Sequence, residues 1–215
     1  MGSALEQLQS ELQPSRENEG ETARRILDTA LALYLEFGLR RTSMEDVARR
    51  AGVGRVTVYR HYGDKDTLFQ AVVLRECRRS MAAILKQLDG IEGVEALFVE
   101  CFVLVLNGIR HHPLIQRLME TEPEWLLPHL TLQMAPVMTL SQNYARLFFQ
   151  QQQGNGYFPG LNVDIASEIL VRLLQSCVLT PGFMLAPDQD ADLRRAAGLL
   201  VETLLRQPKA PEINH

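Results

Sequence analysis

The sequence predicts an all-α protein, and three observations lead to this class. Apolar residues recur at three- and four-residue spacing along most of the chain, as on helices with one buried face. No alternating β-branched run is long enough to indicate a sheet. Of the 215 residues, 46% are hydrophobic and 22% are charged, a balance typical of a chain that buries a substantial core.

The first helices are expected after a loose arm over residues 1–20. A helix over 21–37 carries apolar residues on one side and ends at Gly38, since glycine readily adopts the left-handed conformation that closes many helices. Ser43 and Asp46 have the three-residue spacing of a capping box, which predicts the start of a second helix.

A sharp turn and two further helices follow this capping box. Gly52 and Gly54 allow the backbone to turn, and a third helix is expected over about 55–62. Asp64 is placed to cap a fourth helix, which we expect to reach Leu88.

The rest of the chain is also predicted to be helical. The expected helices cover 92–110, 114–121, a long stretch ending near 153, 163–179 and 189–207. Pro123 and Pro128 bracket an expected turn, residues 154–162 have the composition of an exposed loop, and Pro181–Gly182 separates the last two helices. We expect two domains, over 21–75 and 76–215.

The net charge of −4 conceals a division along the chain. Residues 21–86 contain 13 Lys and Arg against 8 Asp and Glu, whereas residues 87–215 contain 8 against 14. A basic front and an acidic rear favour a nucleic-acid surface at the front and a different role for the rear.

Residues 43–65 carry the most specific signal. They predict two short helices joined by a tight glycine turn, and the second of them has hydroxyl, aromatic and basic side chains. A helix of this kind is suited to the major groove of DNA. A series of short motifs runs across residues 24–69, namely Phe37-Gly38, Thr42-Ser43-Met44, Val47-Ala48, Ala51-Gly52-Val53, Thr57-Val58-Tyr59, His61-Tyr62, Lys65-Asp66 and Leu68-Phe69. Their order and spacing resemble the TetR family of transcriptional regulators.

The resemblance has specific implications for architecture and function. It implies a three-helix DNA-binding head and a larger helical domain that binds a small effector and pairs with a second subunit through its last two helices. Effector binding would move the fourth helix and release the homodimer from a pseudo-palindromic operator. Two further segments resemble regulators of actinobacterial type, namely Pro113 to Pro128 and Val178 to Gly182.

Ten residues are candidates for DNA contact. They are Thr42, Ser43, Arg55, Val56, Thr57, Tyr59, Arg60, His61, Tyr62 and Lys65. Arg55 is suited to bidentate contact with guanine, and Thr57 to a thymine methyl or a phosphate. The resemblance assigns phosphate contacts to the aromatic residues of the third helix, and Lys65 lies at a helix start that favours a phosphate. The alternative is an ordinary solvated helix face.

Eight large apolar residues of the rear domain are candidates for effector contact. They are Phe98, Phe102, Leu106, Met119, Trp125, Met134, Met138 and Phe148. Such a lining would suit a lipophilic effector, because Met adapts to irregular shapes. For any single one of these residues, plain core is the simpler interpretation.

Other chemistries have weaker support. His111 and His112 are adjacent, so their side chains diverge, and no metal or cofactor is expected. Three widely separated cysteines fit a reduced cytoplasmic protein, and the run from Ala96 to Leu106 is too short and too interrupted for a membrane span.

Two alternatives stay open at this point. One is a DNA-binding activator, or a regulator without an effector. The other is a helical enzyme or carrier that contains a helix-turn-helix, for which the sequence offers no nucleophile motif or phosphate loop. Glu120, Glu122 and Glu124 are expected on a solvated surface.

Overall fold

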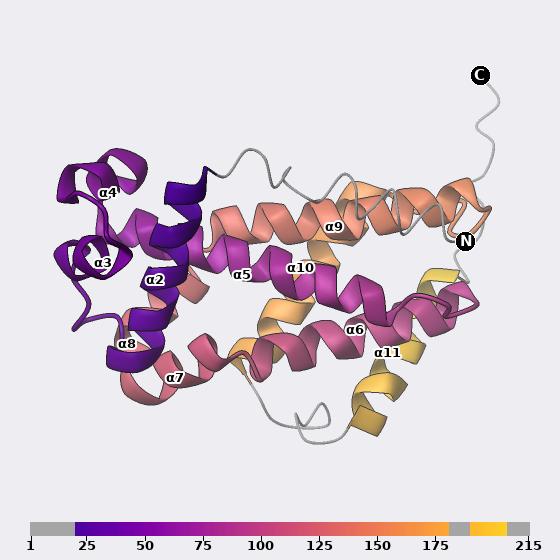
Figure 1. Ribbon diagram of the computed structural model, residues 1–215. Coiled ribbons are helices and arrows are strands. Elements are labelled where there is room, and N and C mark those ends of the chain that lie inside the picture. The colour runs from indigo at the N-terminus through magenta and orange to yellow at the C-terminus, as the bar shows by residue number, and fades with distance from the viewer. Residues whose placement is uncertain (1–19, 181–189, 206–215) are drawn as a thin grey trace. The chain divides into compact units, whose positions relative to one another are not determined.

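The computed structural model describes residues 20–180 and 190–205. Over these residues the fold is all-helical, as predicted, with ten helices and no strand (Figure 1). The helices are α2 Glu21–Phe37, α3 Met44–Ala51, α4 Arg55–Tyr62, α5 Lys65–Gln87, α6 Val94–Arg110, α7 Pro113–Thr121, α8 Pro123–Leu130, α9 Ala135–Gly154, α10 Val163–Leu179 and α11 Asp190–Leu205. None of these ten helices is long and apolar enough to span a membrane. The expected arm before Gly20 and the Pro181–Gly182 break lie outside the described residues.

The described residues form two compact units. The first, called the head here, comprises residues 20–81 and 111–137. The second, called the body, comprises residues 82–110, 138–180 and 190–205. This grouping reflects compactness and places α7 and α8 with the helix-turn-helix. A functional division near residue 75 into DNA-binding and ligand-binding domains stays a prediction.

The head is built on the apolar face of α2. Ile26, Ala30 and Tyr34 are fully buried because a four-residue spacing keeps them on one side of the helix. Within the head, α2 packs against α3 and α7, and α3 against α4 (Figure 1). The core includes side chains from α7 and α8, namely Leu114, Leu118 and Leu126. Residues 111–137 therefore contribute to the interior that supports the helix-turn-helix.

Gly38 and Gly52 of the head have backbone conformations that favour glycine. Gly52 lies at the expected turn and ends α3 in the left-handed helical region, with φ 63° and ψ 38°. Gly38 ends α2 with φ 83°, but its ψ of 169° places it outside that region, in a conformation open almost only to glycine. Gly54, by contrast, has an ordinary φ of −66° and precedes α4.

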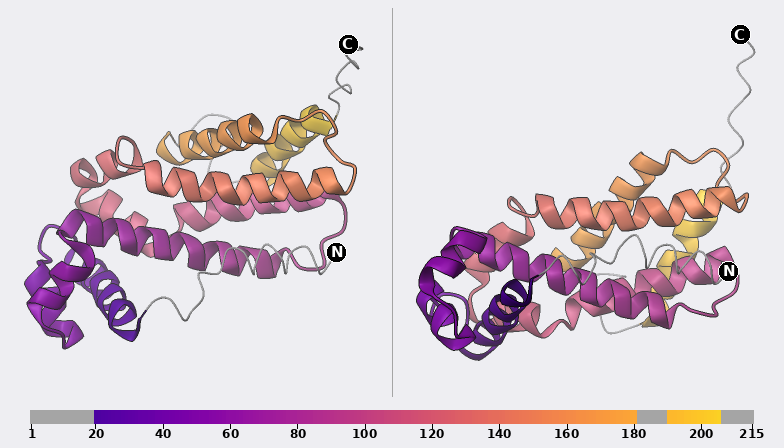
Figure 2. Two further views of the ribbon diagram at one scale, coloured as in Figure 1. Left: turned by 90° about the horizontal axis from the view of Figure 1, so that it is seen from above. Right: turned by 45° about the horizontal axis from the view of Figure 1, so that its top comes forward.

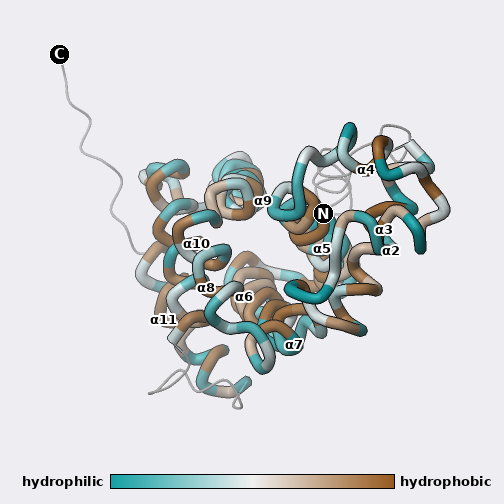
Figure 3. Tube along the Cα trace, turned by 90° about the vertical axis from the view of Figure 1, so that its left-hand side faces the viewer, coloured by the Kyte–Doolittle hydropathy of each residue, from teal (hydrophilic) through white to brown (hydrophobic). Residues whose placement is uncertain are grey.

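The body packs α10 and α11 against α6 (Figure 2). Leu193, Ala197 and Val201 of α11 are fully buried at four-residue spacing, and Phe102 and Leu106 of α6 share the same core. Apolar and polar stretches alternate along α10 and α11 (Figure 3), as expected for helices with one buried face.

The expected turn between Pro123 and Pro128 is wrong, because these residues lie in α8. Pro123 occupies the start of this helix, where a missing N–H group has no consequence. Pro128 lies inside the helix, which extends only to Leu130. Its missing N–H therefore removes one hydrogen bond near the helix end and does not prevent a short helix.

The segment after α9 is more than an exposed loop. Phe158 is 2% exposed and packs in the body core together with Leu161. The amide of Gln153 donates to the carbonyl oxygens of both residues, at 3.0 and 2.9 Å. The segment thus contributes to the core although its Gly and Pro content is typical of a surface loop.

Candidate nucleic-acid interface

The helix-turn-helix of the head is fixed at both ends of α3. The Ser43 hydroxyl accepts a hydrogen bond from the Asp46 N–H, and the Asp46 carboxylate accepts one from the Ser43 N–H, each at 3.1 Å. These hydrogen bonds from Ser43 lower the pKa of Asp46 below its ordinary value. At the other end, the Arg25 guanidinium of α2 donates to the carbonyl oxygens of Ala51 and Gly52.

Thr42 and Ser43 do not offer free donors to a phosphate. Thr42 is 3% exposed; its hydroxyl donates to the Gly38 carbonyl at 2.8 Å and its N–H to the Leu39 carbonyl at 3.1 Å. The N–H and the hydroxyl of Ser43 both donate to the Asp46 carboxylate. A contact of these two residues with the DNA backbone stays a prediction, and in this structure their donors are used inside the head.

One side chain of α4 is buried, and most of the others are exposed. Val58 is fully buried in the head core. The exposed residues of α4 are Arg55, Val56, Tyr59, Arg60 and His61. Thr57 and Tyr62 are half-buried. Val56 is 78% exposed, which leaves its side chain available to a partner.

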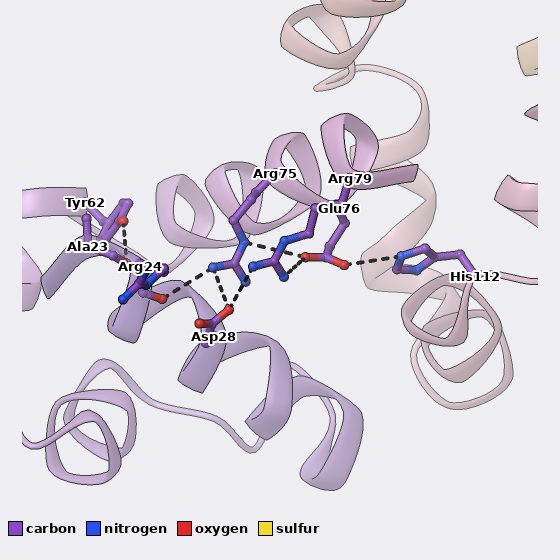
Figure 4. A network of polar contacts seen from close by, with 8 residues as sticks. All are labelled: Ala23, Arg24, Asp28, Tyr62, Arg75, Glu76, Arg79 and His112. Carbon is purple, nitrogen blue, oxygen red and sulfur yellow. Dashed lines mark hydrogen bonds and ion pairs between the residues drawn. The ribbon is translucent and has the colours of Figure 1, made fainter. Parts of the chain in front are cut away.

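Tyr62 differs from its neighbours on α4. Its ring packs against the head core, and its hydroxyl donates to the Ala23 carbonyl of α2 at 3.4 Å (Figure 4). The ring of His61 lies 5.9 Å from it, centroid to centroid. Tyr62 therefore contacts α2, which differs from the expected phosphate contact.

Glu45 of α3 organises two of the exposed residues on α4. Its carboxylate lies 2.6 Å from the Arg55 guanidinium and accepts a hydrogen bond from the Tyr59 hydroxyl at 3.3 Å. The same guanidinium lies 5.3 Å from the centre of the Tyr59 ring. The hydrogen bond with Tyr59 and the charge of Glu45 raise the pKa of Arg55. The sequence interpretation missed Glu45, because no local pattern shows that it faces α4.

Lys65 begins α5, as expected for a phosphate-binding position. Its ammonium group donates to the Arg40 carbonyl at 3.4 Å. Burial lowers the pKa of Lys65, while the negative charges of Glu122 and Asp66 act in the opposite direction. The first turn of α5 is capped by Asp64, whose carboxylate accepts from the Thr67 N–H at 2.8 Å.

Glu122 was expected on a solvated surface, but it is buried in the structure. It is 7% exposed, whereas Glu120 and Glu124 are exposed as expected. Both of its carboxylate oxygens accept from the Arg40 N–H, at 2.9 and 3.2 Å. The Arg40 guanidinium itself pairs with Glu124 at 3.0 Å on the surface. A carboxylate from the α7–α8 corner thus holds the loop between α2 and α3.

A polar network connects α5 to α2 and α7 (Figure 4). Arg75 is 6% exposed and pairs with Asp28 at 2.9 Å, and Arg79 lies 3.1 Å from the same carboxylate. Glu76 lies 2.9 Å from Arg79 and 3.7 Å from the His112 imidazole. Burial raises the pKa of Glu76, but the interaction with the nearby His112 imidazole and the arginine charges outweigh it and lower the pKa.

The eight effector candidates do not all belong to one unit. Phe98, Phe102, Leu106, Met138 and Phe148 lie in the body, and Met119, Trp125 and Met134 lie in the head. Phe98 lies 6.4 Å from Phe102 and 6.1 Å from Phe148 between ring centroids, within an aromatic core. Trp125 packs edge-on against Phe69 at 4.8 Å and contributes to the head core. Met119 is 41% exposed on α7.

The cysteine thiols are unreactive at neutral pH, and no metal site is found among the described residues. Burial raises the pKa of Cys77 and of Cys101 to about 11, and also raises that of Cys177, so all three thiols are neutral at pH 7. Among the described residues, no group of three His, Cys, Asp or Glu side chains is arranged to hold a metal ion.

Comparisons with known proteins agree with this geometry. Residues 26–72 match the family model described as bacterial regulatory proteins of the tetR family. The regulator UidR of Escherichia coli K12 is 25% identical over 173 residues, which cover 79% of this chain and 82% of that protein. An HTH-type transcriptional regulator of Mycobacterium bovis is 34% identical over 107 residues, covering 49% of this chain and 53% of the relative.

Solved structures show the same fold. The TetR-family repressor QsdR of R. erythropolis superposes with a TM-score of 0.63 at 23% identity, covering 85% of this chain and 93% of that one. The repressor AlkX of a Dietzia strain gives 0.64 at 21% identity, covering 85% and 96%. Together with the helix-turn-helix described above, these similarities show that residues 26–72 are a DNA-binding domain of the tetR family type, within a transcriptional regulator whose fold is that of the TetR-family structures.

Proposed function

We propose that this regulator is a homodimeric repressor that binds a pseudo-palindromic operator and is released by a small apolar effector. The observation that carries the proposal is the exposed face of α4, which rests on a single buried residue, Val58. Such a face is available to the major groove, and two copies would read half-sites about 34–36 Å apart.

Individual side chains of this face have distinct proposed roles. Arg55 reads a guanine bidentately, and the exposed Val56 and the Thr57 methyl contact a thymine methyl. Tyr59, Arg60 and His61 contact backbone phosphates. Lys65 adds a full positive charge at the N-terminus of α5, where free N–H groups also favour a phosphate. Thr42 and Ser43 are omitted because their donors are used within the head, and Tyr62 because it contacts α2.

Exposed aliphatic residues of the body support the dimer. Ile165 and Ile169 of α10 are 56% and 60% exposed, and their four-residue spacing places them on one face. Leu199 of α11 is 63% exposed. A second copy that pairs through α10 and α11 would bury these side chains, and each would contribute about 1.5–3 kcal/mol if fully buried.

The proposed effector site uses the body members of the candidate set. Phe98, Phe102, Leu106, Met138 and Phe148 supply aromatic and thioether surface that suits an apolar molecule. The effector must bind the DNA-free conformation more tightly than the DNA-bound one, since equal affinity for the two would shift nothing.

Selection from a random duplex library tests the proposal most directly. The purified protein is compared with a Tyr59→Ala, Arg60→Ala variant whose folding is checked by circular dichroism. Enrichment of an inverted repeat by the natural protein alone is the expected result. Failure to enrich any duplex, also after unfolding, dialysis and refolding to remove a retained effector, would overturn the proposal.

Point variants separate base contacts from backbone contacts. Tyr59→Ala and Lys65→Ala should both weaken binding to all sequences, and Lys65→Ala should also reduce its salt dependence because a positive charge is lost. Arg55→Ala should instead relax the preference at one base pair, by about 1–3 kcal/mol of discrimination. An operator profile unchanged by Arg55→Ala would contradict the base-reading role.

A further inference from the structure

Glu122 lies at the corner between α7 and α8, where it caps the C-terminus of α7 and the N-terminus of α8. Its N–H donates to the Leu118 carbonyl of α7 at 2.8 Å. Its carbonyl accepts from the N–H groups of Trp125 and Leu126 of α8, each at 3.1 Å. Leu118 and Leu126 are buried in the head core. These hydrogen bonds fix the backbone of Glu122 and therefore the position from which its side chain extends.

The side chain extends from this corner to the loop between α2 and α3. Its carboxylate is buried and accepts the Arg40 N–H with both oxygens, at 2.9 and 3.2 Å. A Cβ atom on Gly38 would lie 2.3 Å from one of these oxygens, so glycine is the residue that leaves room for the carboxylate. A buried carboxylate is costly unless it is compensated, and the compensation available here comes from the loop.

Arg40 connects this carboxylate to the DNA-facing side of the head. Its N–H is held by Glu122 and its carbonyl accepts from the Lys65 ammonium at 3.4 Å. The charge of Glu122 also acts on Lys65, whose pKa it raises against the effect of burial. A single residue of the loop thus lies between Glu122 and a proposed phosphate-binding lysine, while Arg41 beside it is exposed.

We propose that Glu122 is a positioning residue for DNA binding: it fixes the loop over 38–42 so that Arg40, Arg41 and Lys65 meet the phosphate backbone together. Glu122 touches no DNA in this arrangement. The inference rests on the proposed function, since it assigns these basic groups to phosphates. It also makes residues 111–137, which follow α6 and reach into the first turn of α9, a point where the DNA affinity of the head can be altered.

The sign of the effect separates this role from simple electrostatics. Removal of a negative charge close to a phosphate-binding lysine should by itself strengthen DNA binding. Loss of positioning should instead weaken it and reduce the number of phosphates contacted. The slope of log K against log salt measures that number, at about 0.9 per phosphate.

The experiment measures operator affinity at several salt concentrations for the full chain and for Glu122→Ala, Glu122→Gln and Glu124→Gln, with the operator obtained by library selection. Glu124 is the matched control, because it is exposed, carries the same charge and pairs with the guanidinium of the same Arg40. Active fractions are titrated and folding is checked by circular dichroism. We expect Glu122→Ala to bind about tenfold more weakly at 0.15 M salt, with a slope smaller by about two for the dimer, and Glu124→Gln to leave the slope unchanged.

A double-variant cycle with Lys65→Met adds a second test. If Glu122 acts through Lys65, the double variant should bind no more weakly than about the weaker single variant, because both changes remove the same contact. Unchanged or tighter binding by folded Glu122→Ala, or additive effects with Lys65→Met, would overturn the inference. If Glu122→Ala does not fold, Glu122→Gln decides on the same criteria. Failure of the natural protein to bind any selected duplex would instead refute the proposed function itself.

Discussion

Replacement of Gly38 by alanine gives a stability test of the contact between the α2–α3 loop and the α7–α8 corner. Alanine at φ 83° and ψ 169° costs about 1–3 kcal/mol in backbone strain. The new Cβ would lie 2.3 Å from a Glu122 carboxylate oxygen. This side chain is buried and bonded to the Arg40 N–H, so its displacement loses a charged hydrogen bond of about 1.5–3 kcal/mol. We therefore expect Gly38→Ala to destabilise the protein by about 2.5–6 kcal/mol.

Two matched variants isolate the contribution of Glu122. Gly63 also has a positive φ, 69°, but a Cβ there would have no atom within 4 Å, so Gly63→Ala reports backbone strain alone. Gly54→Ala, at an ordinary φ of −66°, should have little effect. The free energy of unfolding is measured by urea denaturation at constant protein concentration. Equal destabilisation by Gly38→Ala and Gly63→Ala would refute the steric argument. When Gly38→Ala is introduced into the Glu122→Ala variant, most of its extra destabilisation relative to Gly63→Ala should disappear.

Three further predictions concern the cap of α3, the thiols and acid stability. Ser43→Ala should destabilise the protein by about 1 kcal/mol, seen as a lower melting temperature, because α3 loses its cap. Cys77 and Cys101 should react slowly with a thiol reagent at pH 8 and quickly in urea, since burial raises the pKa of each to about 11; rapid labelling of the native protein would contradict this. The pKa of Glu76 is lowered in the folded state, so its stabilising contribution is present above the unfolded pKa, about 4.3, and is lost as the pH falls through the folded value. The difference in melting temperature between the natural protein and Glu76→Gln should therefore shrink on acidification, and a constant difference would count against the Glu76 network.

Local patterns in the sequence predicted the helix-turn-helix closely. The capping box of Ser43 and Asp46 and the turn at Gly52 depend on neighbours within a few residues, and the structure places both as expected. Pro128 shows a limit of such patterns, since a proline near the end of a short helix resembles a turn signal.

Contacts between distant segments were not accessible in this way. Glu122 and Arg40 are separated by 82 positions, and nothing near Glu122 in the sequence distinguishes it from the exposed Glu120 and Glu124. In the sequence, Thr42 resembles an exposed polar residue. In the structure, its hydroxyl donates to the carbonyl oxygen of Gly38, four residues earlier. Phe158 sits in a segment of loop composition and is buried only because Gln153 and the body core enclose it.

The composition of the head has a consequence for chimeric regulators. An exchange of only residues 26–72 between relatives, the part that the family model covers, would transfer Gly38 and Arg40 without the carboxylate that the loop requires. It would also separate the transferred helices from Leu118 and Leu126, which complete their core in this chain. A transplant that carries residues 111–137 along with the N-terminal helices would preserve both, so the exchangeable module of this protein is discontinuous in sequence.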